Sequence, residues 1–460
     1  MDAALPFTEG VRRTGSVLAV LLACLCGPLL RPVQAGPPAE LPPADRALVG
    51  NYVISPGHAV SIDRFVLDSG ENALLFSDYG TGVVRRLFPA SRTDWEMGPG
   101  FATRTPVELR IHLERDAQGN PADLTLRPVA GEAQTARRVY VREQALHFAS
   151  ADAKLSGTLY LPPGKGPHPA IILLHGSGPL TRHSFGPYPR FFASLGLAVL
   201  VYDKRGTGAS TGLRVDASSG DLRTRPGQSY PDGLVNDALA ALRALQARDD
   251  INPTQIGFWG SSEGGMLATQ VAARDHSVAF AIDSSGFMDP LWQTLDYQVG
   301  ATLRAKGYTA DEIQRARDFS TLWMQVAHTG EDYDRFIAAR RKAVADKEPW
   351  LLSYVSDTFA SRDQMRWAWD HILAFSPLPA LKQVRCPVLG VFGEQDALTN
   401  AAVASANLQR TLTEAGNPDV TVRVFANAGH SLEERPSGAR MATGVFETLA
   451  DWLLSRVQVP

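Results

Sequence analysis

Residues 256–266 read Ile256-Gly257-Phe258-Trp259-Gly260-Ser261-Ser262-Glu263-Gly264-Gly265-Met266 and indicate the architecture of the chain. A short apolar run leads into the pattern Gly-x-Ser-x-Gly, and a helix-like run begins at once. Small residues must flank the serine in such a strand-to-helix turn, because bulky neighbours would block the turn that projects the hydroxyl from the edge of a sheet. The N-terminus of the following helix adds a dipole that favours developing negative charge. The pattern therefore predicts that Ser262 is a nucleophile.

The same pattern occurs a second time, in Gly208-Ala209-Ser210-Thr211-Gly212. This copy follows the loop 203–207 rather than a strand, and no helix pattern starts after it. Ser210 is therefore interpreted as a loop serine. Gly206-Thr207-Gly208 could also begin a dinucleotide-binding loop, but Thr211 stands where the third glycine belongs, so that interpretation is rejected.

Around Ser262, continuous apolar runs alternate with helix-like stretches. The expected strands are 155–161, 170–174, 197–202, 256–259, 279–283, 388–392 and 420–425, and the expected helices include 234–247, 265–273 and 402–414. This alternation predicts an α/β fold, a doubly wound and mostly parallel sheet covered on both faces, over residues 145–460. The alternation stops between about 286 and 375, where we expect a helical cap insertion. Its tryptophans could line an apolar pocket or pack within the insertion itself.

Two further polar residues follow late strands. Asp396 follows the run 388–393 after Glu394 and Gln395, and His430 lies in a glycine-containing loop after the run 420–425. With Ser262 they predict a catalytic triad in which His430 is the general base and Asp396 orients it. Glu394 is the rival acid, and the loop position of Asp396 favours Asp396.

A glycine-rich turn, His175-Gly176-Ser177-Gly178, follows the strand 170–174. Such a turn can point backbone N–H groups at a developing oxyanion. The predicted donors are the N–H of Ser177, or of Gly178 if the turn is shifted, and the N–H of Glu263. His175 is interpreted as a structural residue at the end of the strand.

The N-terminal region differs in pattern from the rest of the chain. Residues 1–35 carry basic, apolar and then small residues in the order of an export signal, and Cys24 gives a weaker lipoprotein alternative. Residues 36–46 are rich in proline and alanine and read as a linker. Short alternating runs over 47–144 predict a small all-β accessory domain. We therefore expect a secreted or periplasmic protein with no stable membrane span in the mature chain.

Composition and charge argue against some classes of ligand and binding partner. The net charge of −3 provides no basic field for nucleic acid. Removal of the signal would leave Cys386 as the one cysteine, which suits a buried structural thiol and neither a disulfide framework nor a zinc site. We expect no metal and no organic cofactor, and the oligomeric state is not indicated.

From about residue 145 onward the sequence resembles the α/β-hydrolase superfamily. In particular it is similar to the bacterial branch with dienelactone-hydrolase, acyl-thioesterase and prolyl-oligopeptidase-like relatives. The resemblance is carried by the turns 175–178 and 203–206, the Ser262 turn and the loops of Asp396 and His430. The β domain resembles small lipocalin-like modules. The N-terminal module is far too short for the propeller of the oligopeptidases, and the insertion supplies a different lid.

The resemblance and the triad together imply a serine hydrolase that cleaves carboxylic esters of a small-molecule acyl substrate. A serine peptidase or aminoacyl amide hydrolase is the main enzymatic alternative, because the same triad cleaves amides. An acyl thioesterase fits an exported protein less well. A binding protein on a retired hydrolase scaffold is the non-enzymatic alternative.

Overall fold

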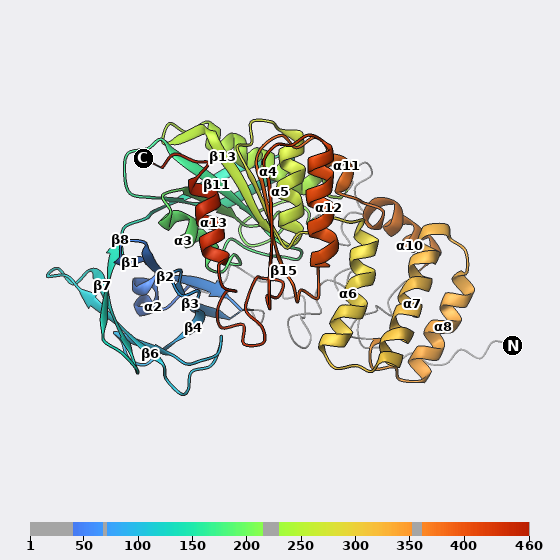
Figure 1. The fold of residues 1–460 in the computed structure, drawn as a ribbon, viewed down its shortest axis with the longest axis horizontal. Helices are drawn as coiled ribbons and strands as arrows, with labels where there is room; N and C mark the ends of the chain where they lie inside the picture. Colours follow the sequence, from blue (N-terminus) through green and yellow to red (C-terminus); the bar gives the residue numbers. More distant parts are fainter. Residues whose placement is uncertain (1–39, 68–70, 215–229, 352–360, 460) are drawn as a thin grey trace.

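The computed structural model describes residues 40–67, 71–214, 230–351 and 361–459. These residues form a small β-barrel and a larger α/β part built on an eight-stranded sheet (Figure 1). The predicted export signal, residues 1–35, lies outside the described residues.

The N-terminal domain is a closed antiparallel barrel of eight consecutive strands. The strands are β1 (Gly50–Ser55), β2 (His58–Val66), β3 (Asn72–Asp78), β4 (Val84–Pro89), β5 (Asp94–Met97), β6 (Leu109–Arg115), β7 (Pro121–Pro128) and β8 (Gln134–Val139). Inward side chains such as Tyr52, Ile62 and Trp95 are fully buried and fill the barrel. The prediction of an all-β N-terminal domain is confirmed.

Part of the expected linker is ordered against this barrel. A short helix, α2 (Pro43–Leu48), begins with proline at its first turn, where a missing N–H costs nothing. Leu41 and Leu48 belong to the barrel core, and the indole of Trp95 donates to Asp45 at 2.8 Å. The described end of segment 36–46 therefore packs as structure, because Leu41 joins the apolar core of the barrel.

The large sheet has the strand order β16-β15-β14-β13-β11-β12-β10-β9. Its strands are β9 (Arg142–Ser150), β10 (Ala153–Leu161), β11 (His168–Leu174), β12 (Ala198–Tyr202), β13 (Ile251–Ser261), β14 (Ala281–Ser284), β15 (Val388–Gly393) and β16 (Val420–Phe425). The six strands from β11 to β16 run parallel to one another, whereas β10 pairs antiparallel with β12 and with β9. Since β9 starts at Arg142, the sheet begins three residues before the boundary expected at 145.

Helices cover the sheet on both faces (Figure 1). They are α3 (Tyr188–Ser194) and α13 (Val445–Leu454) on one face, and α4 (Asp232–Gln246), α5 (Glu263–Arg274), α11 (Leu378–Leu381) and α12 (Ala401–Glu414) on the other. Neighbouring residues of β11 point to opposite faces of the sheet. Ile172 packs under α4 and α5, and Ile171 packs under α3 and α13. Because both faces of the sheet are buried, the central strands are continuous apolar runs in the sequence.

A helical insertion separates β14 from β15. Its described elements are α6 (Leu291–Ala305), α7 (Ala310–Thr329), α8 (Tyr333–Ala345), α10 (Arg362–Ala368) and the π-helical turn η2 (Trp369–Leu373). Trp323 and Trp350 are buried in the apolar cluster that the insertion shares with one face of the sheet. The helices stand beside the sheet (Figure 1), and their role as a cap stays a prediction. In the described part of the chain, no helix is both long and apolar enough to cross a membrane.

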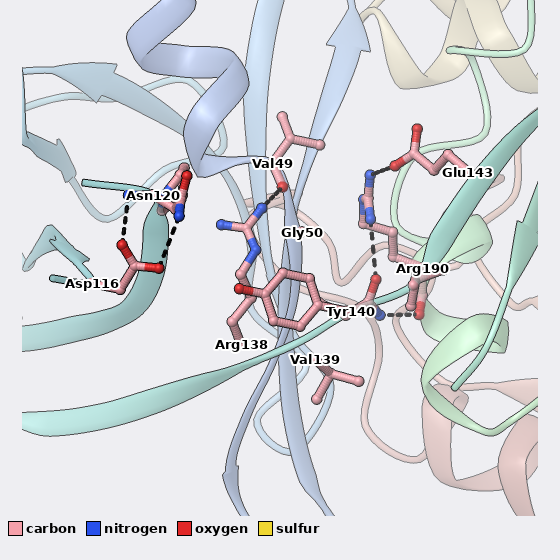
Figure 2. A pocket seen from close by; sticks show the side chains of 12 residues that line it. Val49, Gly50, Asp116, Asn120, Arg138, Val139, Tyr140, Glu143 and Arg190 are labelled. Atoms are coloured by element: carbon pink, nitrogen blue, oxygen red, sulfur yellow. Dashed lines mark hydrogen bonds and ion pairs between the residues drawn. The ribbon is translucent and has the colours of Figure 1, made fainter. Parts of the chain in front are cut away.

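A buried arginine of α3 joins the barrel to the α/β part (Figure 2). Arg190 donates to Glu143 at 2.6 Å and to the side chain of Asn51 at 3.1 Å, and it pairs with Asp63 at 3.2 Å. The amide of Asn51 donates back to the carbonyl of Arg190 at 2.7 Å. A cavity of about 430 Å³ lies at this junction, lined in part by Arg138. These bonds fix α3 against β1 and β2.

Candidate active site

Ser262 sits on a strained turn between β13 and α5. Its backbone has φ 58° and ψ −122°, a conformation that costs a non-glycine residue on the order of 1–3 kcal/mol. The strain is held by hydrogen bonds on both sides: Ser262 N–H donates to the carbonyl of Ser284 at 2.8 Å, and Gly265 N–H donates to the carbonyl of Ser262 at 2.9 Å. The turn therefore presents the residue at the carboxyl end of a central strand.

The two glycines of the Gly-x-Ser-x-Gly pattern are required by close backbone approach. A Cβ on Gly264 would overlap the carbonyl of Leu174, at the end of β11. A Cβ on Gly260 would overlap the carbonyl of Gly264 itself. The first turn of α5 can press against the strand ends only because neither position carries a side chain.

Asp396 and His430 are joined directly. His430 Nδ1 lies 2.8 Å from Asp396 Oδ2, and the Asp396 side chain is 1% exposed. The other carboxylate oxygen, Oδ1, accepts from the N–H of Leu398 at 2.7 Å and of Thr399 at 3.0 Å. Backbone donors thus fix the carboxylate in the orientation in which it meets the imidazole.

The charge of Asp396 also sets the protonation of His430. Burial disfavours the charged imidazolium and lowers the pKa of His430, whereas the negative charge of Asp396, its hydrogen bond and the charge of Glu433 raise it. The net pKa of His430 is raised above its ordinary value. A histidine held in this way is a stronger base than a free imidazole.

The rival acid lies elsewhere. Glu394 is exposed, and its carboxylate accepts from the N–H of Asn427 at 3.2 Å. Among the described residues, the carboxylate that hydrogen-bonds the imidazole of His430 is that of Asp396.

Ser262 lies at the same edge of the sheet as this pair, because β13, β15 and β16 are parallel and all three residues follow their carboxyl ends. Within the described residues, no hydrogen bond joins the Ser262 hydroxyl to His430. Such catalytic hydrogen bonds are often long until substrate binds. The structure thus brings Asp396 and His430 into contact and places Ser262 at their edge, and the role of each residue stays a prediction.

The glycine-rich turn after β11 lies against the serine. A Cβ on Gly176 would be 3.4 Å from Ser262 Cβ and 4.0 Å from its Oγ. Ser177 follows in this turn, and Glu263 opens α5 next to the serine. Both expected oxyanion donors therefore belong to segments that border Ser262, although their action as donors stays a prediction.

Two residues that resemble catalytic ones are built into the scaffold. The imidazole of His175 lies 3.0 Å from the carbonyl of Thr181 through Nε2, and burial lowers its pKa to about 3. The hydroxyl of Ser210 accepts from the N–H of Ser156 at 3.0 Å and donates to the carbonyl of Asp203 at 2.7 Å. These contacts agree with the structural interpretation of both residues.

The helical insertion contacts the acid loop, which sequence reasoning missed. On α6, the Tyr297 hydroxyl donates to the carbonyl of Asp396 at 2.7 Å, and the Gln298 amide donates to the carbonyl of Leu398 at 2.9 Å. No local pattern signals this contact, because the partners are about a hundred residues apart. The insertion therefore supports the loop that holds Asp396.

Cys386 is a free thiol, and it is partly rather than fully buried. Burial raises its pKa to about 12, which leaves it an inert thiol at neutral pH. Over the described ranges, no group of three or more His, Cys, Asp or Glu side chains is arranged to hold a metal ion.

Known proteins resemble parts of this chain. The quorum-quenching protein AidA of Acinetobacter baumannii is 28% identical over 162 residues, which is 35% of this chain and 50% of AidA. The esterase EstD of Thermotoga maritima is 32% identical over 127 residues, 26% of this chain and 27% of EstD. The chain thus spans half or less of the length of these two relatives. A solved esterase structure from Pyrococcus furiosus aligns with a TM-score of 0.44 at 17% identity, over 69% of this chain and 92% of the esterase.

The sequence model of the alpha/beta hydrolase family matches residues 171–440, more than half of the chain. The matched region runs from β11 through the Ser262 turn and the helical insertion to beyond His430. It includes the parallel strands from β11 to β16, the strained turn and the acid–histidine contact described above. The chain therefore belongs to the alpha/beta hydrolase family.

Proposed function

We propose that this protein is an exported serine hydrolase that cleaves carboxylic esters through Ser262, His430 and Asp396. His430 takes the proton of the Ser262 hydroxyl as its oxygen attacks the acyl carbonyl. Asp396 stabilises the imidazolium that forms, and the backbone N–H groups of Ser177 and Glu263 hold the oxyanion. The alcohol leaves with the proton from His430, and water then hydrolyses the acyl-enzyme by the same steps.

The observation that carries the proposal is the strained conformation of Ser262. A non-glycine residue at φ 58° in a tight strand-to-helix turn persists only when its surroundings over-determine it, and such strain clusters at functional sites. At the same edge of the sheet, His430 lies 2.8 Å from a buried carboxylate, whose negative charge makes the imidazole a stronger base.

A fluorophosphonate probe tests this proposal. We expect the wild-type protein to be labelled, and Ser262→Ala to lose labelling and about 10⁴- to 10⁶-fold of its turnover. Ser210→Ala is the matched control, because it removes a buried serine of the same sequence pattern. We expect it to lower stability by about 1–3 kcal/mol and to keep labelling.

A Ser262→Ala variant that retained more than a tenth of the wild-type rate would reject the nucleophile. Loss of labelling in a folded Ser210→Ala protein would show that the other serine is the nucleophile. A folded wild-type protein that took no label would favour a binding protein on a retired scaffold.

The acyl bond is assigned as an ester because one sequence relative, EstD, is an esterase. A panel of p-nitrophenyl esters, aminoacyl anilides and acyl thioesters tests the assignment. We expect the highest kcat/KM on the esters. A preference for anilides would support the peptidase alternative, and a preference for thioesters the thioesterase.

Export rests on the basic, apolar and small residues of segment 1–35. We expect full-length chain expressed in a bacterium to be recovered outside the cytoplasm with Gly36 as its first residue. Intact mass measurement of the recovered protein checks this. Recovery in the cytoplasm with residues 1–35 retained would contradict export.

A further inference from the structure

A buried ammonium group lies between the two segments that border Ser262. Lys204, in the turn after β12, donates from Nζ to the carbonyl of Gly176 at 2.9 Å and to Oε2 of Glu263 at 2.6 Å. The side chains of Lys204 and Glu263 are 3% and 1% exposed. One charge therefore contacts both the glycine-rich turn and the residue after the nucleophile.

The contact with Gly176 fixes the direction of the neighbouring N–H. The carbonyl of Gly176 and the N–H of Ser177 belong to one planar peptide unit, and in a trans peptide these two groups point in opposite directions. A hydrogen bond that holds the carbonyl toward Lys204 therefore holds the Ser177 N–H away from it. The positive charge also polarises that peptide, which strengthens the N–H as a donor.

The contact with Glu263 acts on the second donor. The N–H of Glu263 is the other expected oxyanion donor, and it stands at the N-terminus of α5. Because Lys204 holds the side chain of the same residue, it restrains the position of that backbone relative to Gly176. Burying two charges carries a large desolvation penalty, and apolar residues of similar volume often stabilise such a site better. Stability alone therefore gives little reason for an ion pair at this place.

We propose that Lys204 is a positioning residue that aligns both oxyanion donors, acting through the Gly176–Ser177 peptide and through Glu263. The proposal rests on the proposed function, since it presupposes a tetrahedral intermediate on Ser262. Lys204 does not touch the substrate in this proposal. Its effect is confined to the stage at which negative charge develops on the acyl oxygen.

The test uses the full chain and the double variant Lys204→Met/Glu263→Met. This variant removes both charges, so neither is left buried without the other, and it keeps both backbone N–H groups. We expect kcat to fall about 10- to 100-fold, less than the 10²–10³-fold that loss of one whole donor costs, with KM little changed. Affinity for a trifluoromethyl ketone, which forms a tetrahedral adduct with the serine, should fall by the same factor as kcat/KM.

A neighbouring ion pair supplies the matched control. Arg205 donates to Asp237 at 2.7 and 2.5 Å, and both side chains are 1% exposed. In the described structure this pair contacts neither Gly176 nor Glu263. We expect Arg205→Met/Asp237→Leu to change the melting temperature without changing kcat or the ratio of ketone affinity to KM.

Three outcomes separate the ideas. Full kcat and full ketone affinity in the folded Lys204→Met/Glu263→Met variant would overturn the positioning role while Ser262→Ala still abolished activity. An equal loss of kcat in the Arg205→Met/Asp237→Leu control would also overturn it, because a general effect of removing buried charge would then suffice. Wild-type activity in Ser262→Ala would instead reject the proposed function itself.

Discussion

Replacement of Asp396 by asparagine probes the acid–histidine pair with little change of shape. The carboxylate accepts three hydrogen bonds, from His430, Leu398 and Thr399. An asparagine can keep its carbonyl oxygen toward the two backbone donors, which places its NH₂ group against His430 Nδ1. The amide then donates to Nδ1, so the imidazole carries its proton on Nε2 and cannot accept a proton from Ser262.

The expected loss in kcat is about 10⁴-fold, which corresponds to about 5.5 kcal/mol of transition-state stabilisation. The pH dependence should change as well. The neutral imidazole is the base, so kcat/KM falls as the pH drops through the pKa of His430. Because Asp396 raises that pKa, its replacement should lower the pKa and move the acid limb of the profile to lower pH.

Steady-state hydrolysis of a p-nitrophenyl ester between pH 4 and 9 measures both effects. Glu394→Gln is the control, because Glu394 is exposed and bonded to Asn427 rather than to the histidine. We expect its rate to stay within about twofold of wild type. A collapse in Glu394→Gln together with a folded Asp396→Asn that kept a tenth of its rate would refute the reasoning.

Three further substitutions test the supports of the site and of the barrel. Tyr297→Phe removes the hydrogen bond to the carbonyl of Asp396, and steady-state kinetics should show kcat about fivefold lower, for a bond of about 1 kcal/mol. Arg190→Ala leaves Asp63 buried without its cation, and calorimetry should show a loss of about 3 kcal/mol in stability. Trp95→Ala empties the centre of the barrel, and calorimetry should show about 3–5 kcal/mol less stability for that domain.

Each of these has a clear contrary result. An unchanged kcat in Tyr297→Phe would mean that α6 does not support the acid loop. An Arg190→Ala protein as stable as wild type would show that other contacts hold the barrel to α3. A Trp95→Ala protein with unchanged calorimetry would place the stability of the barrel outside its central cluster.

The sequence was sufficient to predict the elements that are buried on both faces or that need an unusual backbone conformation. The strands β11, β12 and β15 were predicted within two residues at each end, since a strand covered on both faces must be apolar throughout. The edge strand β16 was predicted as well, although its residues are half-buried or exposed. The start of β13 was missed, because residues 252–255 include a proline and three polar side chains that are exposed or half-buried. The edge strand β9 was also missed, since it alternates exposed and half-buried residues like the strands of the barrel.

Contacts between distant segments could not be predicted. The bond from Lys204 to Glu263 joins residues 59 apart, and each residue alone reads as a surface charge. Burial of a charge depends on the partner that the fold supplies, and periodicity carries no information about that partner. The same holds for Tyr297, whose hydroxyl meets a carbonyl 99 residues further along the chain. The Ser262 turn was predictable because its requirements are local.

The attachment of α6 to the acid loop bears on how this chain could be re-engineered. Helical insertions are natural places to exchange when new substrate selectivity is wanted, and the insertion here enters and leaves the sheet through short connections. A graft that replaced α6 would also remove the hydroxyl and the amide that hold the carbonyls of Asp396 and Leu398. A chimera that keeps α6 and varies only α7 to α10 would separate selectivity from the geometry of the acid.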